Sequence, residues 1–320
     1  MFIRPLFRFV PDNTRIRFMR GRFIGLATSA VLSIASVILF FYPGLNLGID
    51  FRGGVVMQVE TPGPADFAKL RSALSAQHEG GAGLQRFGAD NQVLISLEAQ
   101  SDEKATQAEV TRVRAAMDQA APGSRVLRTD AVGASVSAEL FRNGLLALGI
   151  SLLMILVYIW FRFEWQFAVG AVATLLLDTT KTIGFLALTR LDFDLVMVAA
   201  ILTVIGYSTN DKVVVYDRVR ENLRKYKSMP LRELIDLSIN ETLNRTLATS
   251  STVFLASLPL ALFGGSTLSG FAWTMLFGIV VGTSSSIFIA APILLLLGEN
   301  RLRRDAQPAK APKATVKAGM

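Results

Sequence analysis

The chain has 320 residues, of which 51% are hydrophobic and 18% are charged, and its mean hydropathy is positive. This composition is too apolar for an ordinary soluble domain and predicts a polytopic membrane protein with an aqueous insertion. Cysteine is absent, which excludes a disulfide framework and thiolate zinc sites. The formal net charge of +8 comes from basic residues beside apolar segments, as the positive-inside rule produces. We therefore expect membrane lipids, and no nucleic acid, as partners.

The N-terminal segment, residues 1–22, carries six arginines and one acidic residue, Asp12. The apolar run that follows, residues 23–42, is long enough to cross about 30 Å of hydrocarbon. Aromatic residues and Pro43 close this run, where a signal peptide would have a small-residue cleavage site. We predict an uncleaved first transmembrane helix with a cytoplasmic N-terminus and an external segment after it.

Residues 44–139 form a long aqueous stretch with 12 acidic and 9 basic residues. Its pattern predicts the order strand, helix, strand, strand, helix, strand, which is that of a ferredoxin-like α+β domain. The predicted elements are residues 54–61, 64–77, 84–87, 92–97, 101–120 and 124–132. Ser101 is the expected cap of the second helix. The single His78 has no second histidine beside it, and we expect it to be solvated.

Five further apolar runs lie within residues 140–297 and bring the number of predicted transmembrane helices to six. They cover residues 145–161, 167–188, 195–215, 243–262 and 271–297. Six basic residues mark 218–240 as a cytoplasmic loop, and residues 298–320 are predicted to be a cytoplasmic, disordered basic tail. The predicted fold is a polytopic α-helical membrane protein with one external ferredoxin-like domain between its first two transmembrane helices.

Two charged residues, Asp211 and Lys212, stand inside the fourth predicted span. A charge at the centre of a membrane helix costs about 2.5–3.5 kcal/mol on insertion scales, so it normally faces the protein interior and has a partner. Helical spacing places Tyr207 and Ser208 on the face of Asp211, and Asn210 adds a further polar side chain. Asp211 is therefore a protonatable carboxylate on an ion pathway, half of a structural ion pair, or a residue that lies nearer the membrane interface.

Other charged residues stand in neighbouring spans. Asp178 and Lys181 are three residues apart, close enough on a helix to compensate one another. Arg245 opens the fifth span, where Thr242 and Thr249 fall on its face. Arg245 either forms a hydrogen-bonded ion site with these hydroxyls or extends to the cytoplasmic surface.

An acid and an arginine on neighbouring helices suggest a mechanism. Arginine keeps its charge in proteins, so only Asp211 gains and loses a proton. Ionised Asp211 would attract Arg245, and protonation would release it. No Walker-type phosphate loop is present, so we expect no nucleotide or other cofactor and predict a proton gradient, or a partner, as the energy source.

Four sequence motifs resemble the signatures of the SecF family of bacterial protein-export membrane subunits. They are GIDFRGG (Gly48–Gly54), RFEW (Arg162–Trp165), GYSTNDKVVVYDRVREN (Gly206–Asn222) and TLNRTLATS (Thr242–Ser250), and they occur in the expected order. The resemblance implies six transmembrane helices and an external domain after the first. It also implies that the important intramembrane acid and arginine of the family fall on Asp211 and Arg245. In GIDFRGG we expect Asp50, Gly53 and Gly54 to form a turn.

The resemblance further implies SecD as a partner, association with the SecYEG channel, and use of the proton motive force to move a translocating, unfolded preprotein. The expected location is the bacterial inner membrane, with both termini cytoplasmic and residues 44–139 periplasmic, in the resistance-nodulation-division superfamily. The sequence departs from the family at Leu177, where His is usual, and at Lys181 and Lys212, where small, aliphatic or hydroxylated residues are usual. We expect Lys181 to pair with Asp178.

Two other functions are compatible with the pattern. One is half of a proton-driven small-molecule or lipid exporter of the same superfamily, for which larger external domains and two fused halves would be expected. The other is a structural scaffold of the channel, in which Asp211 and Arg245 form an inert bridge. None of these functions is enzymatic.

Overall fold

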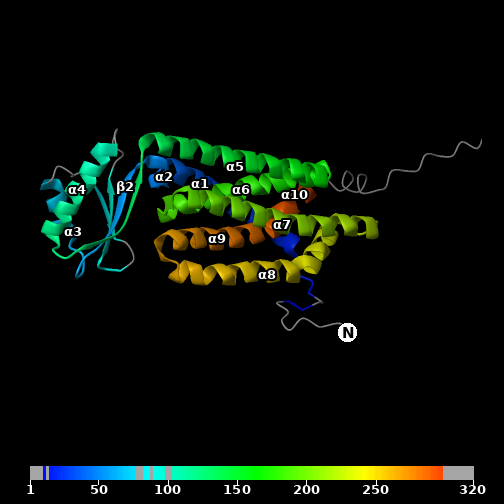
Figure 1. Ribbon diagram of the computed structural model, residues 1–320. Coiled ribbons are helices and arrows are strands. Elements are labelled where there is room, and N and C mark those ends of the chain that lie inside the picture. The colour runs from blue at the N-terminus through cyan, green and yellow to red at the C-terminus, as the bar shows by residue number, and fades with distance from the viewer. Residues whose placement is uncertain (1–9, 12–13, 77–81, 87–88, 98–102, 298–320) are drawn as a thin grey trace, which may run out of the picture.

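The computed structural model describes residues 10–11, 14–76, 82–86, 89–97 and 103–297, and it consists of a long helical bundle with a small sheet domain at one end (Figure 1). Within the described residues, six helices are long and apolar enough to cross a membrane, which confirms the predicted number. The predicted order of one span, the aqueous domain and five further spans is also confirmed.

The bundle is formed by helices that precede the sheet domain in the sequence and helices that follow it. They are η1 (Phe18–Gly21), α1 (Arg22–Phe41), α5 (Ala134–Arg162), α6 (Trp165–Thr189), α7 (Leu195–Lys225), α8 (Leu231–Phe263), α9 (Gly265–Ser285), the π-helical turn η2 (Ser286–Ala290) and α10 (Ala291–Leu296). The apolar windows of α6, α7 and the α9–α10 span are 56% buried, against 11–17% for α1, α5 and α8. The first three are therefore the centre of the bundle, and the others present apolar surface to the membrane.

Small residues let α9 approach α7 closely. A Cβ atom added to Gly278 would overlap the Val204 side chain, and one added to Gly282 would lie 2.9 Å from Ser208. Membrane helices associate through such close contacts because lipid provides no hydrophobic drive between them. The α7–α9 contact also brings the Thr283 hydroxyl of α9 against Asp211 of α7.

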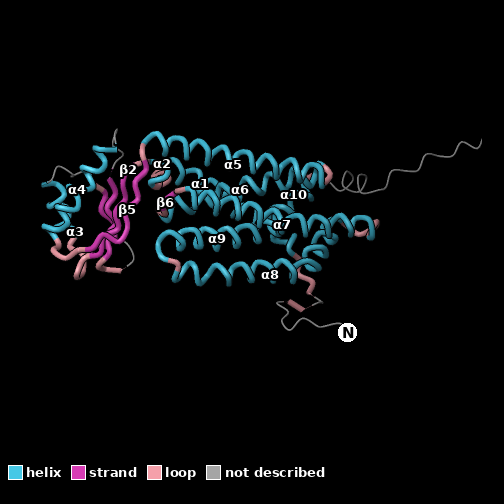
Figure 2. Tube along the Cα trace, viewed as in Figure 1, coloured by secondary structure: helices cyan, strands magenta, loops and turns pink. Residues whose placement is uncertain are grey.

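The sheet domain has the predicted order of elements. They are β2 (Gly54–Glu60), α3 (Phe67–Ala76), β3 (Gly83–Arg86), β4 (Gln92–Leu97), α4 (Glu103–Ala120) and β5 (Arg125–Val132). The sheet is antiparallel with strand order β3-β4-β2-β5, the arrangement of a ferredoxin-like fold. Both helices cover the face of the sheet that points away from the bundle (Figure 2). The predicted cap Ser101 and the predicted solvated residue His78 lie outside the described residues.

A short connection joins the two parts. It consists of β1 (Asn46–Leu47), α2 (Ile49–Arg52) and β6 (Asp192–Phe193), and β1 pairs with β6 in parallel. Two-residue strands carry too little pattern to be predicted from sequence. This pairing ties the start of the sheet domain to the turn between α6 and α7.

The structure corrects one boundary. The segment predicted as a cytoplasmic loop, residues 218–240, is mostly helical, because α7 continues to Lys225 and α8 begins at Leu231. Its charged residues lie on helical faces that leave Leu234 and Ile235 buried in the core. The basic tail, residues 298–320, lies outside the described part of the chain.

Candidate functional site

Asp211 lies near the middle of α7 with 1% of its surface exposed. Its Oδ2 accepts a hydrogen bond of 3.3 Å from the Thr283 hydroxyl on α9. Thr283 in turn shares a hydrogen bond of 2.8 Å with the Ser250 hydroxyl on α8. Both hydroxyl residues line a cavity of about 500 Å³ between α8 and α9. A polar chain therefore leads from the buried carboxylate to a space at the side of the bundle.

Arg245 does not form the predicted ion pair with Asp211. Its charge is close enough to act on Asp211, but none of the ion pairs between described residues joins the two, and Arg245 is exposed on α8. Thr249 donates to the Arg245 carbonyl at 3.0 Å, and Thr242 donates to the Ser238 carbonyl at 3.0 Å. The hydroxyls of Thr242 and Thr249 are thus bonded to backbone carbonyls of α8 itself and do not connect Arg245 to Asp211.

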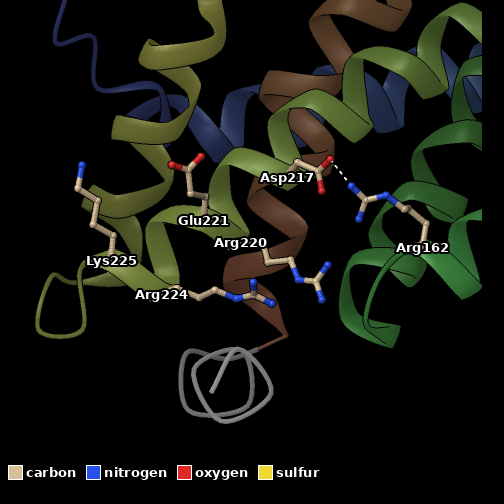
Figure 3. A pocket seen from close by; sticks show the side chains of 6 residues that line it. All are labelled: Arg162, Asp217, Arg220, Glu221, Arg224 and Lys225. Carbon is tan, nitrogen blue, oxygen red and sulfur yellow. Dashed lines mark hydrogen bonds and ion pairs between the residues drawn. The ribbon is translucent and has the colours of Figure 1, made fainter. Parts of the chain in front are cut away.

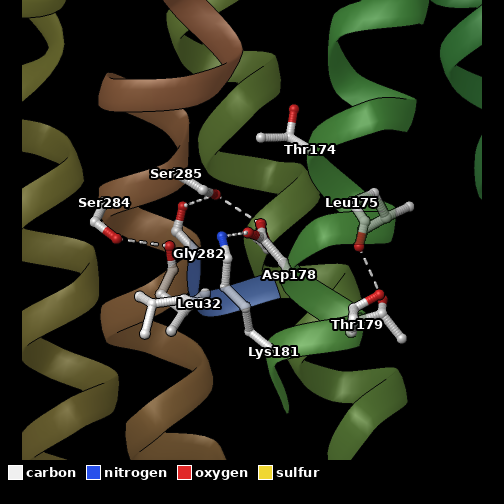
Figure 4. A network of polar contacts seen from close by, with 12 residues as sticks. Leu32, Thr174, Leu175, Asp178, Thr179, Lys181, Gly282, Ser284 and Ser285 are labelled. Carbon is white, nitrogen blue, oxygen red and sulfur yellow. Dashed lines mark hydrogen bonds and ion pairs between the residues drawn. The ribbon is translucent and has the colours of Figure 1, made fainter. Parts of the chain in front are cut away.

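A second cluster of buried charges surrounds Asp178 (Figure 4). Asp178 of α6 accepts three hydrogen bonds at Oδ2, from Lys212 Nζ at 2.8 Å, the Ser208 hydroxyl at 2.8 Å and the Ser285 hydroxyl at 2.6 Å. Lys181 Nζ lies 3.8 Å from the other oxygen, Oδ1. Asp178 and Lys212 are each 1% exposed, so this is a fully buried ion pair between α6 and α7.

These contacts settle the partners of two lysines. The expected pair of Lys181 with Asp178 is confirmed, but the shorter contact of Asp178 is with Lys212, which sequence reasoning left without a partner. Lys212 also donates to the Ser208 hydroxyl, one helical turn before it. The spacing of Ser208 and Lys212 in the sequence indicates this second contact, because residues four apart share a helix face.

The two adjacent residues Asp211 and Lys212 consequently point to different partners. Lys212 faces α6, and Asp211 faces α8 and α9. A buried charge that loses its counter-ion is costly, so protonating Asp178 would leave Lys212 and Lys181 uncompensated. Asp211 accepts only a hydroxyl hydrogen bond within the described residues, so it can bind a proton without breaking a buried ion pair.

The other polar residues predicted on α7 do not join the hydrogen bonds that lead from Asp211 through Thr283 to Ser250. Ser208 bonds Asp178 and not Asp211, although helical spacing puts Ser208 and Asp211 on one face. Asn210 is exposed. Tyr207 Oη is buried and has no hydrogen-bond partner among the residues that the structure describes. The polar residues predicted on one face of α7 therefore have partners on different helices, Ser208 on α6 and Asp211 on α9.

The GIDFRGG segment connects the sheet domain to the start of α7. Asp50 Oδ2 accepts a hydrogen bond of 3.1 Å from the Leu195 amide, at the N-terminus of that helix, where the helix dipole favours an anion. Gly53 and Gly54 have φ values of 73° and 115°, so both positions require glycine, as the predicted turn implies. Asp50 thereby joins the segment that precedes the sheet domain to the first turn of α7.

Asp194 caps the same helix end. Its side chain accepts a hydrogen bond of 2.9 Å from the Met197 amide. Burial raises the pKa of the Asp194 carboxyl, although the amide hydrogen bond acts in the opposite direction. The start of α7 is therefore held by two carboxylates, one from each side of the connection.

The opposite end of α7 binds the RFEW segment. Arg162 Nη2 lies 2.6 Å from Asp217 Oδ2, and Arg220 Nη2 lies 2.9 Å from Glu164 Oε1. Tyr216 donates to the Ala290 carbonyl at 3.1 Å. Two of the motifs recognised in the sequence are thus in direct contact. Within the described residues, no group of three or more His, Asp or Glu side chains is placed to hold a metal ion.

Comparison with known proteins agrees with these features. Residues 112–300 match the family described as "Protein export membrane protein SecD/SecF, C-terminal", and residues 38–61, which include GIDFRGG, match the "SecD/SecF GG Motif". The "Protein translocase subunit SecF" of Cereibacter sphaeroides is 42% identical over 97% of this chain and 95% of its own length. The subunit of the same name from Rickettsia prowazekii is 41% identical over 95% of this chain and 97% of its own.

A solved structure is also similar. The crystal structure of SecDF from Thermus thermophilus, described as a translocon-associated membrane protein, superposes with a TM-score of 0.82 at 33% identity. The superposition covers 92% of this chain and 40% of the SecDF chain. The chain therefore belongs to the SecD/SecF family of protein-export membrane proteins, and its relatives of near-equal length are SecF translocase subunits.

Proposed function

We propose that this chain is the SecF-type subunit of a protein-export complex that uses the proton motive force to promote passage of an unfolded preprotein. SecD is the proposed partner, because the matching family is described as SecD/SecF and the similar solved structure is that of SecDF. The complex would act on preproteins that have entered the SecYEG channel. The names of the SecF relatives and the description of SecDF as translocon-associated support this assignment.

The observation that carries the proposal is the environment of Asp211. It is a fully buried carboxylate with hydroxyl contacts, beside a cavity, and it forms no ion pair with another residue of the described part of the chain. An ionisable residue inside a membrane bundle commonly marks an ion pathway. Each proton moving across 100 mV of membrane potential supplies about 2.3 kcal/mol.

In a second arrangement of the same site, Arg245 would lie close to Asp211. Ionised Asp211 attracts the guanidinium of Arg245 from the neighbouring helix, and protonation releases it. We assign the present arrangement, in which Asp211 accepts from Thr283 and Arg245 is exposed, to the released state of this proposed cycle. A shift of α7 on exchange between the two arrangements would reach the sheet domain through the Asp50 contact at its N-terminus.

The proposed orientation follows from the basic residues of both termini and of residues 218–240, which place these segments in the cytoplasm of a bacterium. The sheet domain, on the other side of the inner membrane, would then be periplasmic and available to the emerging preprotein. Neither a cofactor nor a metal has a part in this mechanism.

Complementation tests the assignment. Cells depleted of their own SecF receive this chain together with its SecD, and export of a reporter preprotein is measured by signal-sequence processing and protease protection. Restored export supports the proposal. Unchanged export defects, with both subunits present in the membrane, contradict it. Equal restoration by an Asp211→Asn/Arg245→Gln double variant would indicate a scaffold instead of a motor.

A further inference from the structure

A charged cavity lies at the C-terminal end of α7 (Figure 3), which is the end of the bundle away from the sheet domain (Figure 1). Its volume is about 500 Å³, within the size range of ligand pockets. Four cationic and two anionic side chains line it, which gives a net charge of +2. They are Arg162, Asp217, Arg220, Glu221, Arg224 and Lys225. None of these residues takes part in the proton site at Asp211.

Both anionic residues of this cavity are already paired with arginines, so some of its cationic side chains have no anionic partner within it. Asp217 is bound by Arg162 at 2.6 Å, and Glu221 is bound at 2.6 Å by Arg218. Arg224 makes no ion pair with any residue that the structure describes, and it stands one helical turn from Arg220. Like charges at this spacing repel one another, so the pair favours an anion between them.

A buried donor strengthens the case for a bound anion. Arg220 binds Glu164 through Nη2, but its Nε–H is buried and has no hydrogen-bond partner among the described residues. A buried polar group without a partner costs free energy comparable to a lost hydrogen bond. Guanidinium groups suit phosphate oxygens, which they bind through two parallel hydrogen bonds.

The surroundings of the cavity identify the source of the phosphate. Trp160 and Phe161, at the end of α5, are 64% and 86% exposed, and Trp165 at the start of α6 is also exposed. Exposed aromatic side chains at helix ends are typical of the boundary between hydrocarbon and water. Arg162 stands between them in the sequence, so the cavity lies at the level of lipid headgroups. Basic pockets between transmembrane helices at that level bind anionic headgroups.

We propose that this cavity is a binding site for the phosphate headgroup of an anionic phospholipid. Arg220 and Arg224 hold the phosphate, Arg162 closes one side of the site, and the acyl chains run over the aromatic residues at the ends of α5 and α6. A lipid held there would fix the cytoplasmic end of α7 against α5. The site is independent of the proposed proton coupling.

The test measures lipid retention by the complex of this chain with its SecD. The purified complex is titrated in detergent with dioleoyl-phosphatidylglycerol or dioleoyl-phosphatidylcholine, and bound lipid is counted by native mass spectrometry. We expect phosphatidylglycerol to bind preferentially, and Arg224→Gln to weaken it about tenfold, the equivalent of one charge-assisted hydrogen bond. Arg224 is the chosen site because its replacement breaks no ion pair of the described structure.

Two separate control variants, Arg20→Gln and Arg232→Gln, each remove one positive charge from an exposed arginine outside the cavity, as Arg224→Gln does inside it, and should leave lipid binding unchanged. Equal retention of both lipids would overturn the proposal, as would an equal loss in either control. Free glycerol phosphate provides the last arm. If it displaces phosphatidylglycerol at equal concentration, the ligand is a soluble phosphate and the lipid assignment is wrong.

Discussion

The ion pair between Asp178 and Lys212 makes a quantitative prediction about the centre of the bundle. Removing one partner of a buried ion pair costs about 3–5 kcal/mol. Asp178→Asn leaves both Lys212 and Lys181 without a counter-ion, so we expect a loss near the upper end of that range. Lys212→Met leaves Asp178 with Lys181 at 3.8 Å and with two hydroxyl donors, so its cost should lie near the lower end. Lys181→Met removes only the longer contact and should cost least.

The double variant Asp178→Asn/Lys212→Met tests the reasoning further. It removes one charge of each sign from the core, so Lys181 alone is left without its counter-ion. We expect it to be more stable than Asp178→Asn alone, with an interaction energy of about 0.5–3 kcal/mol in the double-mutant cycle. The assay is thermal and denaturant unfolding of the purified protein in one detergent. Additive losses, or a greater loss from Lys181→Met than from Lys212→Met, would refute the account of this cluster.

Three further predictions concern other parts of the bundle. Gly278→Leu should separate α9 from Val204 of α7 and lower the thermal unfolding temperature, whereas a leucine introduced at a lipid-facing position should not; equal effects would contradict the close contact. Because burial raises the folded-state pKa of the Asp194 carboxyl, the free energy of unfolding should fall as the pH rises from about the ordinary carboxyl pKa toward the raised one. Asp194→Asn keeps a capping side chain and should make this dependence on pH weaker. The measurement is the unfolding midpoint as a function of pH. Arg162→Asp should destabilise the α5–α7 contact, and the exchanged pair Arg162→Asp/Asp217→Arg should recover part of the loss, measured by protease resistance in membranes.

Local patterns predicted most of the fold. The six spans followed from apolar runs, and the sheet domain followed from alternation and turn residues whose signals lie within about ten residues. The pairing of Lys181 with Asp178 was also visible, because both residues belong to one helix. In GIDFRGG, the glycines indicated a turn because few other residues adopt positive φ.

The parts that could not be predicted depend on contacts between helices. The sequence places Asp211 beside Lys212 but does not say how α7 is rotated, and that rotation sends Lys212 to Asp178 and Asp211 to Thr283. Arg245 was expected to face the acid, yet the position of α8 leaves it exposed. The basic residues of 218–240 predict the side of the membrane on which this segment lies, but a charge count carries no information on whether α7 and α8 continue beyond the hydrocarbon.

Gradient-stimulated export tests the central claim most directly, namely that Asp211 is the coupling carboxylate and Asp178 a structural one. Inverted membrane vesicles carrying this chain and its SecD import a reporter preprotein with and without a proton gradient, and the ratio is normalised to the amount of assembled complex. The account predicts that Asp211→Asn abolishes the stimulation, while Asp178→Asn/Lys212→Met retains it at equal assembly. Full stimulation in the Asp211→Asn complex would contradict the account.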